Sequence, residues 1–405
     1  MTRPMELPAY MLGILERLHT AGFAVYVVGG AVRDSLMGAC PHDFDVTTSA
    51  PPAQVKAIFE AAGHTVVETG LAHGTVTVLC DKTPIEITTF RLEGGYRDTR
   101  HPDHVTFTDR LEFDLSRRDF TVNAIAYAPD EGYIDLFGGM EDLKGGCIRC
   151  IGDPNKRFGE DALRILRALR FSAVLDFDLD TQTAEAAIQN AALLKHISCE
   201  RHTAELEKML LSVYPERLYA LLLSHRAVFE AVLPELAALS ENEYDVLCQR
   251  TIRIPGENGL RTAFLLAQSG HTEALLSHLR FSTLFSSRVR KMRDAFEEAL
   301  DAQTRMQARF LLSRYGETSC IDTATALAAV GENTVLLPLV KEVLADGDCV
   351  SVSQLAVDGN TLLTLGLSGK QIGTALSLLL NEVMSDKLPN ETESLLGYLK
   401  NTAFA

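Results

Sequence analysis

Two aspartates separated by one residue, Asp43 and Asp45, are the side chains of this sequence whose types and spacing most directly suggest chemistry. In a β-strand, alternate side chains leave the same face, so both carboxylates would point one way while Phe44 and Val46 enter the core. Adjacent carboxylates repel each other, and a divalent cation bound between them removes that repulsion. Carboxylate oxygens are hard ligands that suit Mg²⁺. We therefore predict a Mg²⁺ site; the alternative is a solvated pair of acids at a strand end.

A glycine pair precedes the aspartates, in the segment Gly29-Gly30-Ala31-Val32-Arg33-Asp34. It follows a short apolar run, residues 24–28, which predicts a buried strand that ends in a tight turn. Glycine lets the backbone approach a phosphate closely, and the N–H groups at the start of the next helix would face that phosphate. Arg33 adds a side chain that is always charged. We expect Gly30 and Arg33 to bind phosphate groups.

A third carboxylate, Glu86, lies in the segment Ile85-Glu86-Ile87-Thr88-Thr89-Phe90-Arg91. Polar and apolar side chains alternate there, which is typical of a strand with one buried face. Glu86 would then stand on the polar face, where it can join the aspartate pair. The alternative is an ordinary glutamate on the solvated face of a sheet.

The segment Arg117-Arg118-Asp119-Phe120-Thr121-Val122-Asn123 combines an arginine pair with an acid and an amide four positions apart. On a helix, residues with that spacing share a face. Arg118 could then contact a triphosphate, while Asp119 and Asn123 lie near ribose hydroxyls. The alternative is a basic helix start that makes surface ion pairs.

A fourth group begins at Glu160-Asp161 and continues through Arg164, Arg167 and Arg170. Asp161 and Arg164 have the spacing that brings two side chains to one face of a helix. An aspartate accepts from the exocyclic amine of cytosine or adenine, and an arginine donates to the ring acceptors beside it. Guanine and uracil present the opposite polarity and would leave buried groups unpaired. The alternative is a common helical salt bridge.

The elements that must position these residues change in kind along the chain. Up to about residue 150, strands and helices alternate, with helices expected at 7–20, from residue 31 and at 52–61. Strands are expected at 24–28, 43–48, 65–68, 75–80, 85–90 and 133–136. After about residue 155 the periodicity is helical throughout and predicts no further strand. We therefore expect an α/β head followed by an all-helical remainder.

Composition limits the classes of protein that these elements can form. The chain has 405 residues, 46% of them hydrophobic, and a formal net charge of −16. Length alone suggests several domains, and the acidic balance argues against a protein that simply coats nucleic acid. No apolar run is long enough for a membrane span, and the amino-terminal segment does not resemble an export or transit peptide. We expect a cytoplasmic protein with no membrane partner.

The eight cysteines are scattered along the chain, which favours reduced thiols. Cys147 and Cys150 have Cys-x-x-Cys spacing, but a zinc site needs a second pair of ligands, and the sequence offers none at similar spacing. The glycines on both sides favour a short strand there. We expect no role for this pair in metal binding or redox chemistry.

The order of these motifs resembles one known family. GGAVRD, DFD, EITTFR, RRDFTVNA, EDALRILRALRF and ERHTAELEKML are similar to the class II tRNA nucleotidyltransferases, the CCA-adding enzymes and their bacterial poly(A) polymerase relatives. The resemblance covers about residues 20–212, with a weaker likeness to Bacillus-type bacterial enzymes beyond. It implies an α+β, polymerase β-like nucleotidyltransferase head at 1–150, then an all-α neck at 151–212, body at 213–320 and tRNA-binding tail at 321–405.

The resemblance also implies roles for individual residues. Asp43 and Asp45 would bind two Mg²⁺ ions with support from Glu86, and Asp161 with Arg164 would select the base. The remaining positions would contact the triphosphate, the ribose or other phosphates: Gly30, Arg33, Arg118, Asp119, Asn123, Arg167 and Arg170. Glu200, Arg201 and Glu205 match the last motif and would support the neck. The implied substrates are the tRNA 3′ end, CTP and ATP; the sequence leaves a homodimer open.

One segment bears on which activity of the family this chain has. Leu92 to His104 is polar and rich in glycine, and we expect a flexible loop there. In the family, enzymes that add only C lack this loop, so its presence argues for full CCA addition. Addition of A alone or poly(A) tailing remains an alternative within the family, although no long basic carboxyl-terminal extension follows. An alternative of another class is a catalytically silent RNA-binding protein, which would not need an intact carboxylate pair.

Overall fold

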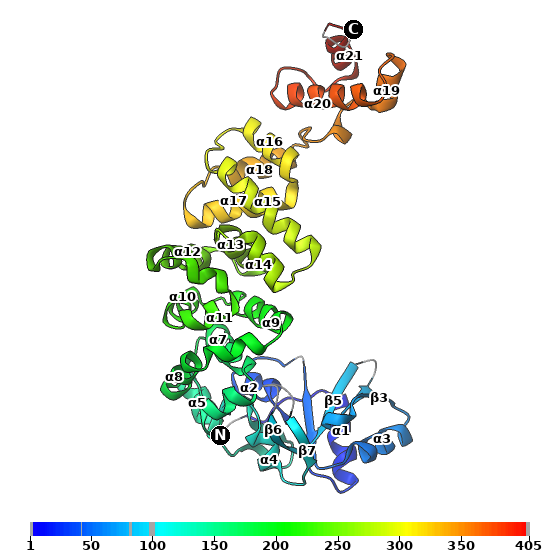
Figure 1. Ribbon diagram of the computed structural model, residues 1–405. Helices are drawn as coiled ribbons and strands as arrows, with labels where there is room; N and C mark the ends of the chain where they lie inside the picture. Colours follow the sequence, from blue (N-terminus) through cyan, green and yellow to red (C-terminus); the bar gives the residue numbers. More distant parts are fainter. Residues whose placement is uncertain (1–2, 42, 81–82, 97–101, 402–405) are drawn as a thin grey trace. The chain divides into compact units, whose positions relative to one another are not determined.

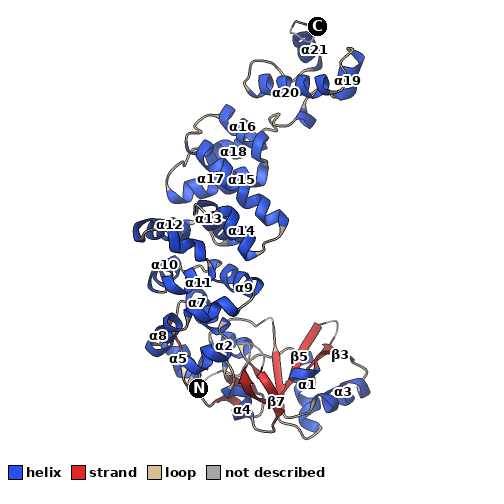
Figure 2. Cartoon of the chain, viewed as in Figure 1, coloured by secondary structure: helices blue, strands red, loops and turns tan. Residues whose placement is uncertain are grey.

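The computed structural model describes residues 3–41, 43–80, 83–96 and 102–401. Its contacts divide the chain into two compact units, Met1–Ala237 and Ala238–Ala405, which we describe one at a time (Figure 1). All strands of the described residues belong to the first unit, as the red segments of Figure 2 show. The predicted α+β head with a helical remainder is therefore the observed fold class.

The first unit contains a seven-stranded sheet with the order β3-β4-β5-β2-β1-β8-β9. Two smaller sheets pair β6 with β7 and β10 with β11. The strands are β1 (Val25–Val28), β2 (Asp45–Thr48), β3 (Thr65–Gly70), β4 (Thr75–Cys80), β5 (Thr83–Thr89), β6 (Arg91–Tyr96), β7 (Pro102–Phe107), β8 (Ile125–Ala128), β9 (Gly132–Asp135), β10 (Cys147–Ile148) and β11 (Asp178–Leu179).

Helices surround this sheet and make up the rest of the chain. Those of the first unit are α1 (Ala9–Thr20), α2 (Gly30–Leu36), α3 (Pro52–Ala61), α4 (Leu111–Ser116), α5 (Gly139–Gly145), α6 (Pro154–Glu160), α7 (Leu163–Leu175), α8 (Thr181–Gln189), α9 (Cys199–Leu210), α10 (Pro215–Ser224) and α11 (Arg226–Val232). Those of the second unit are α12 (Glu241–Arg253), α13 (Leu260–Gln268), α14 (Thr272–Leu279), α15 (Thr283–Leu300), α16 (Arg305–Tyr315), α17 (Glu317–Val330), α18 (Leu336–Ala345), α19 (Gly359–Thr364), α20 (Lys370–Met384) and α21 (Thr392–Lys400).

The central strand β1 is buried on both faces, which is why its sequence is apolar without alternation. Val25 and Val27 pack in a core that also takes in α1 and α3. Tyr26 and Val28 face a second cluster with Leu115 of α4. These two cores hold β1 and its neighbour β2 rigidly, so the turn after β1 and the aspartates at the start of β2 are fixed in space.

Several predicted elements match the structure, and some boundaries do not. The strands expected at 75–80 and 133–136 and the helix expected at 52–61 are present within a residue or two. The sequence did not indicate β8, which is a continuous apolar run without alternation. The prediction of a flexible loop at Leu92–His104 is wrong at both ends of the segment, because the residues there belong to β6 and β7, which pair as an antiparallel ribbon. Residues 97–101 of that segment lie outside the described residues.

Two further expectations need correction beyond residue 150. The short strand β11 contradicts the expectation of helices only; its parallel partner is β10, the strand expected at the Cys-x-x-Cys segment. The helix expected through Asp161 is also interrupted, because Asp161 has extended backbone angles, φ −142° and ψ 103°. Its side chain accepts a hydrogen bond from Leu163 N at 3.0 Å, and such local bonding competes with a continuous helix.

The second unit is helical throughout its described residues. Capping boxes begin two of its helices, at Ser240 with Glu243 and at Thr304 with Gln307, and satisfy backbone donors that would otherwise lack partners. Residues from 355 to 399 form a hydrophobic cluster around Leu362, Leu379 and Leu395.

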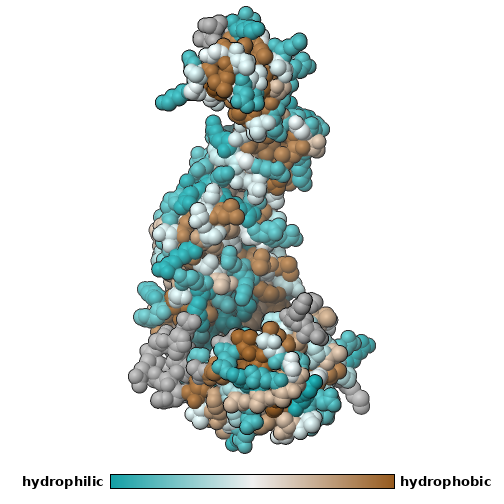
Figure 3. Space-filling view, turned by 90° about the vertical axis from the view of Figure 1, so that its right-hand side faces the viewer, coloured by the Kyte–Doolittle hydropathy of each residue, from teal (hydrophilic) through white to brown (hydrophobic). Residues whose placement is uncertain are grey.

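Figure 3 shows hydrophilic (teal) and hydrophobic (brown) residues mixed over the face in view. Among the described residues, none of the helices has the length and hydropathy needed to cross a membrane.

Candidate functional site

A cleft of about 540 Å³ in the first unit gathers nearly all of the predicted site residues. Strand β2, helices α2 and α7, the break between α6 and α7, and the segment after α4 each contribute side chains. The cleft is lined by Gly29, Gly30, Arg33, Asp43, Asp45, Arg118, Asp119, Asn123, Asp161, Arg164, Arg167, Arg170 and Phe171. Every predicted site residue except Glu86 is in this set, although these residues span more than a hundred positions of the sequence.

The turn between β1 and α2 forms one wall of the cleft and requires glycine. Gly29 has φ +76°, a region that residues with a side chain rarely adopt. A Cβ atom at Gly29 would lie 3.4 Å from both Arg118 Nη1 and Asp45 Oδ2. Because glycine has no side chain, the backbone at this position can lie close to both the guanidinium of Arg118 and the carboxylate of Asp45.

Asp45 lies at the start of β2, where it pairs with Val28 of β1 and with Glu86 of β5. Protein atoms crowd its carboxyl group and raise its pKa; Arg118 opposes this rise, and the charge of Asp43 adds to it. The two aspartates therefore form an incompletely neutralised pair of hard oxygen ligands, which fits a divalent cation. Glu86 is in register beside Asp45 but does not line the cleft, and the described residues contain no cluster of three acidic, His or Cys ligands.

Asp114 is a residue of this site that the sequence analysis missed. Its side chain is fully buried in α4 and accepts from Thr47 Oγ1 at 3.0 Å and from Arg117 Nη2 at 2.8 Å. The oxygen that accepts from Thr47, Oδ2, also lies 3.5 Å from Arg118 Nη2. One carboxylate thus ties β2 to the arginine pair. The signal was present in the sequence, because an acid three and four positions before two arginines is typical of helical ion pairing.

Arg118 brings a charge that its protein partners compensate only in part. Burial lowers its pKa, whereas Asp114 and Asp45 raise it. Its Nε atom is buried and has no hydrogen-bond acceptor in the part of the chain that the structure describes. A partly buried, incompletely paired guanidinium is stabilised by a further anion, so this side of the cleft favours phosphate.

Asp119 and Asn123 connect two arginines across the cleft. Asp119 accepts from Arg167 Nε at 2.8 Å and from Asn123 Nδ2 at 3.1 Å. Asn123 in turn accepts from Arg33 Nη1 at 2.7 Å. Burial alone would raise the pKa of Asp119, but Arg167 and the hydrogen bonds outweigh it and lower this pKa to about 2. The segment forms a short 3₁₀ turn rather than the expected helix, yet Asp119 and Asn123 do meet.

The predicted base-reading pair lies at the break between α6 and α7. Asp161 accepts from Arg201 Nη2 at 3.1 Å. Arg164, whose side chain is 9% exposed, donates to Glu160 Oε2 at 2.9 Å and to the Arg117 carbonyl at 3.1 Å. Two acceptors from separate segments fix the guanidinium in one orientation. Asp161 and Arg164 both line the cleft, but not as neighbours on one helix face as the spacing suggested.

The motif at 200–205 was expected to support the neck, and two of its residues contact side chains that line the cleft. Arg201 binds Asp161, and Glu205 forms an ion pair of 2.7 Å with Arg170 Nε. Phe171 also lines the cleft and was not predicted. An available signal was its position one residue after Arg170 and four after Arg167, which is the spacing of contacts along a helix.

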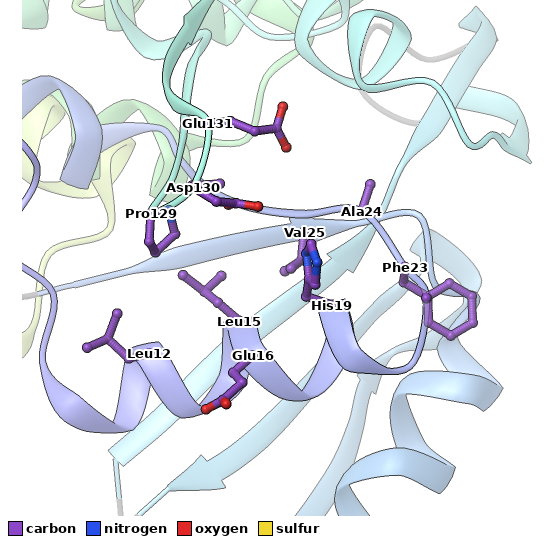
Figure 4. A pocket seen from close by; sticks show the side chains of 12 residues that line it. Leu12, Leu15, Glu16, His19, Phe23, Ala24, Val25, Pro129, Asp130 and Glu131 are labelled. Carbon is purple, nitrogen blue, oxygen red and sulfur yellow. The ribbon is translucent and has the colours of Figure 1, made fainter.

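A second cleft of about 600 Å³ lies between α1 and the turn that joins β8 to β9 (Figure 4). Its wall is mostly apolar, with Leu12, Leu15 and Pro129, and its charged groups include Glu16, Asp130 and Glu131. The negative charges of these carboxylates repel a triphosphate, and the apolar walls offer it no charged partner. The chemistry of this cleft therefore does not fit the predicted substrate, whereas that of the arginine-lined cleft does.

Comparisons with known proteins agree with the chemistry of the arginine-lined cleft. Three family models match: the poly A polymerase head domain at residues 25–149, a probable RNA and SrmB-binding site of polymerase A at 176–239, and a putative tRNA nucleotidyltransferase domain 2 at 259–399. A CCA-adding enzyme of Lactobacillus helveticus is 35% identical over 396 residues, covering 96% of each chain.

Two further relatives extend this picture. A CCA-adding enzyme of Leuconostoc mesenteroides is 52% identical over 198 residues, which is 49% of this chain and 48% of that enzyme. The crystal structure of the Bacillus stearothermophilus CCA-adding enzyme in complex with CTP superposes with a TM-score of 0.81, at 31% identity and covering 98% of each chain. Similarity in sequence and in fold thus extends over nearly the whole chain.

Proposed function

This chain belongs to the CCA-adding enzyme family of tRNA nucleotidyltransferases, and on that premise we propose that it adds the terminal C, C and A to the 3′ end of tRNA from CTP and ATP. No nucleic-acid template is needed, because protein side chains select the base. The observation that carries the proposal is the single cleft that joins a carboxylate pair, several arginines and the Asp161–Arg164 pair.

We propose that Asp43 and Asp45 hold the divalent cations of the reaction and that these are Mg²⁺. Bound there, the ions would supply Lewis-acid chemistry: a lower pKa for the tRNA 3′-hydroxyl and charge neutralisation at the triphosphate. The raised pKa of Asp45 and the repulsion from Asp43 support this assignment, because both are relieved by a cation. Glu86, in register with Asp45, is proposed as a supporting carboxylate.

In the proposed reaction the 3′-hydroxyl oxygen of tRNA bonds to the α-phosphorus, and the bond from that phosphorus to the bridging oxygen of pyrophosphate breaks. The role of Arg33 and Arg118 is to bind the negative charge of the triphosphate. Gly29 and Gly30 let the backbone lie close to these groups. Pyrophosphate leaves with the electron pair of the broken bond, and no covalent enzyme intermediate forms.

Base selection is assigned to Asp161 and Arg164. Cytosine and adenine offer an amine to the carboxylate and ring acceptors to the guanidinium, whereas guanine and uracil offer the reverse. Both side chains already have protein partners, Arg201 for Asp161 and Glu160 for Arg164. These partners fix the orientation of Asp161 and Arg164, and a correct base must form hydrogen bonds with the two side chains in that orientation. A wrong base leaves buried groups unpaired.

One experiment tests the proposed function and its alternatives together. Purified protein is incubated with three tRNAs, ending before CCA, after the first C and after CC, with labelled CTP or ATP and Mg²⁺. We expect incorporation on all three, with EDTA stopping it and added Mg²⁺ restoring it. Incorporation of A on the CC-ended tRNA alone would assign A-addition instead, runs of A would assign poly(A) tailing, and no incorporation would leave a silent RNA-binding protein.

Domain boundaries, location and assembly complete the proposal. We propose a head at 1–150, a neck at 151–212, a body at 213–320 and a tail at 321–405, with tRNA bound by the tail. A cytoplasmic location is supported by the eight cysteines, none of which forms a disulfide. Whether the protein acts as a monomer or a homodimer is measured by sedimentation at assay concentration.

A further inference from the structure

Phe171 lies on the wall of the arginine-lined cleft, and three guanidinium groups surround its ring. The guanidinium carbons of Arg170, Arg33 and Arg167 lie 4.1, 5.2 and 5.4 Å from the ring centroid. All three distances are within the range in which a cation is attracted to the electron-rich face of an aromatic ring. Two of the arginines come from α7 and one from α2, so one side chain contacts cationic groups from two elements.

Three like charges at one place repel each other, and the protein compensates each of them separately. Arg33 pairs with Asp34 at 2.7 Å, Arg167 with Asp119 at 2.5 Å and Arg170 with Glu205 at 2.7 Å. Asn123 links the Arg33 and Arg167 pairs through Asp119, but none of these contacts includes all three arginines. Phe171 is the contact that the three arginines have in common.

The ring of Phe171 is itself held in place. Phe171 is 8% exposed, and its ring meets that of the fully buried Phe120 edge to face, with centroids 5.7 Å apart and planes at 79°. Phe120 precedes the turn that carries Asn123, so the aromatic pair links α7 to the segment that binds Arg33 and Arg167. A ring fixed in this way offers the arginines one defined position.

An aromatic contact has a property that a carboxylate partner lacks. The attraction between a guanidinium and a ring does not use any of the five N–H donors of arginine. A carboxylate, in contrast, occupies the donors that a phosphate would need. Phe171 therefore adds to the positioning of each arginine without occupying any of the donors that its carboxylate partner leaves for a substrate.

We propose that Phe171 is the positioning residue that gathers Arg33, Arg167 and Arg170 into one phosphate-binding group for the incoming nucleotide. This inference rests on the proposed function and adds to it a residue that touches no reacting atom. It assigns the ring an electrostatic role, because its electron-rich face favours the cationic group. It follows that binding of CTP, rather than the chemical step, depends on the electron density of the ring.

The test replaces Phe171 by phenylalanines carrying one, two or three fluorine atoms on the ring. Fluorination withdraws electron density from the face while nearly preserving the shape, so the attraction to cations falls stepwise. We expect KM for CTP to rise with each fluorine, by about fivefold over the series, and kcat to change less than about twofold. Phe171→Leu should raise KM for CTP further, whereas Phe171→Tyr should keep it close to that of the unsubstituted protein.

Phe158 provides the matched control. It is buried as well, lies on the neighbouring helix α6 and does not line the cleft. The same fluorinated series at Phe158 should leave KM unchanged. The proposal would be overturned if KM for CTP stayed constant over the series at Phe171 or rose equally over the series at Phe158. It would also be overturned if fluorination of Phe171 lowered kcat and left KM unchanged. Failure of the unsubstituted protein to incorporate CTP would instead refute the proposed function, so the two failures are distinguishable.

Discussion

Asp45 and Asp119 line the same cleft, but their carboxyl groups are in opposite electrostatic situations. Burial is the first influence on both. For Asp119, the ion pair with Arg167 and the hydrogen bonds outweigh burial and lower its pKa to about 2. For Asp45, burial and Asp43 outweigh Arg118, and its pKa is raised. Asp119 thus has its cation within the protein, whereas the Asp43–Asp45 pair still favours one from solution.

Substitution of Asp43 tests the metal assignment. Asp43→Ala should lower kcat for C and A addition by roughly a thousandfold or more, because one ligand of the cations is lost. Circular dichroism and the thermal midpoint should stay the same, since Asp43 is exposed. Asp109→Ala, at another exposed aspartate, should retain full activity. Activity within tenfold of the unsubstituted protein would contradict the assignment.

Arg164 tests base selection separately from phosphate binding. In the unsubstituted protein, a wrong base is rejected because it leaves the buried Arg164 guanidinium without its hydrogen bonds. Arg164→Ala removes this penalty, so the ratio of kcat/KM for CTP to that for UTP should fall by roughly 10- to 100-fold. Lys156→Ala, at an exposed lysine of α6, should keep the ratio. Affinity for tRNA, measured by filter binding, should change little in both variants. An unchanged ratio in Arg164→Ala would rule out its role as a base reader.

Asp114 predicts a dependence of stability on pH. Burial would raise its pKa, but Arg117, Arg118 and Thr47 together lower it below the usual value. A carboxyl group with a lowered pKa in the folded state stabilises the fold above its unfolded pKa of about 4, and that stability is lost as pH falls through the folded value.

Asp114→Asn should therefore cost about 3 kcal/mol of unfolding free energy at pH 7, since it removes the buried carboxylate that forms ion pairs with Arg117 and Arg118. The cost should shrink at acid pH, where the aspartate itself becomes protonated. Urea unfolding at several pH values measures both effects. Asp109→Asn serves as the exposed control, and an equal cost at every pH would contradict the ion-pair explanation.

At the scale of elements, the site depends on interruptions of regular structure. The turn at Gly29, the short 3₁₀ turn before β8 and the break between α6 and α7 each place a polar side chain in the cleft. The helix α5 supports the second of these. A Cβ atom at Gly139 would overlap the carbonyl oxygen of Thr121 and lie 2.8 Å from its carbonyl carbon. Close approach of α5 to this turn thus requires glycine.

Gly139→Ala should therefore destabilise the first unit by about 1–3 kcal/mol and also weaken CTP binding, because the displaced turn carries Asn123. Gly145→Ala is the matched control in the same helix. A Cβ there meets nothing within 4 Å, so the change should be neutral or slightly stabilising. Thermal unfolding and CTP titration measure the two effects. Equal behaviour of the two variants would show that the close approach does not matter.

At the scale of the whole molecule, charge and stability are distributed unevenly. The chain has a net charge of −16, yet the cleft is lined by five arginines against four aspartates. A triphosphate therefore meets a locally favourable site on an acidic protein, and coating of RNA by charge alone is disfavoured. Each compact unit also has its own buried core, and the carboxyl-terminal cluster around Leu379 lies wholly outside the unit that carries the cleft.

Leu379→Ala should lower the stability of the second unit by about 2–5 kcal/mol, because it removes a fully buried side chain from that cluster. Affinity for CTP should be unchanged, since the cleft belongs to the first unit. Leu363→Ala, at a leucine that is 53% exposed, should cost less than about 1 kcal/mol. Denaturant unfolding and CTP titration give the two readouts, and a loss of CTP affinity in Leu379→Ala would refute this independence.

The sequence by itself determined the α/β head with its helical remainder and nearly the whole list of residues that line the cleft. Alternation marks strands, helical periodicity marks helices and paired acids or glycines suggest chemistry, while the resemblance to a known family implied the roles of most cleft residues. Only the tertiary structure decided how Asp161 and Arg164 are oriented, and that Asp114 and Phe171 belong to the site. Their partners are distant in sequence, such as Thr47 for Asp114 and Arg33 for Phe171. Contacts of that kind arise from packing, which no local pattern encodes.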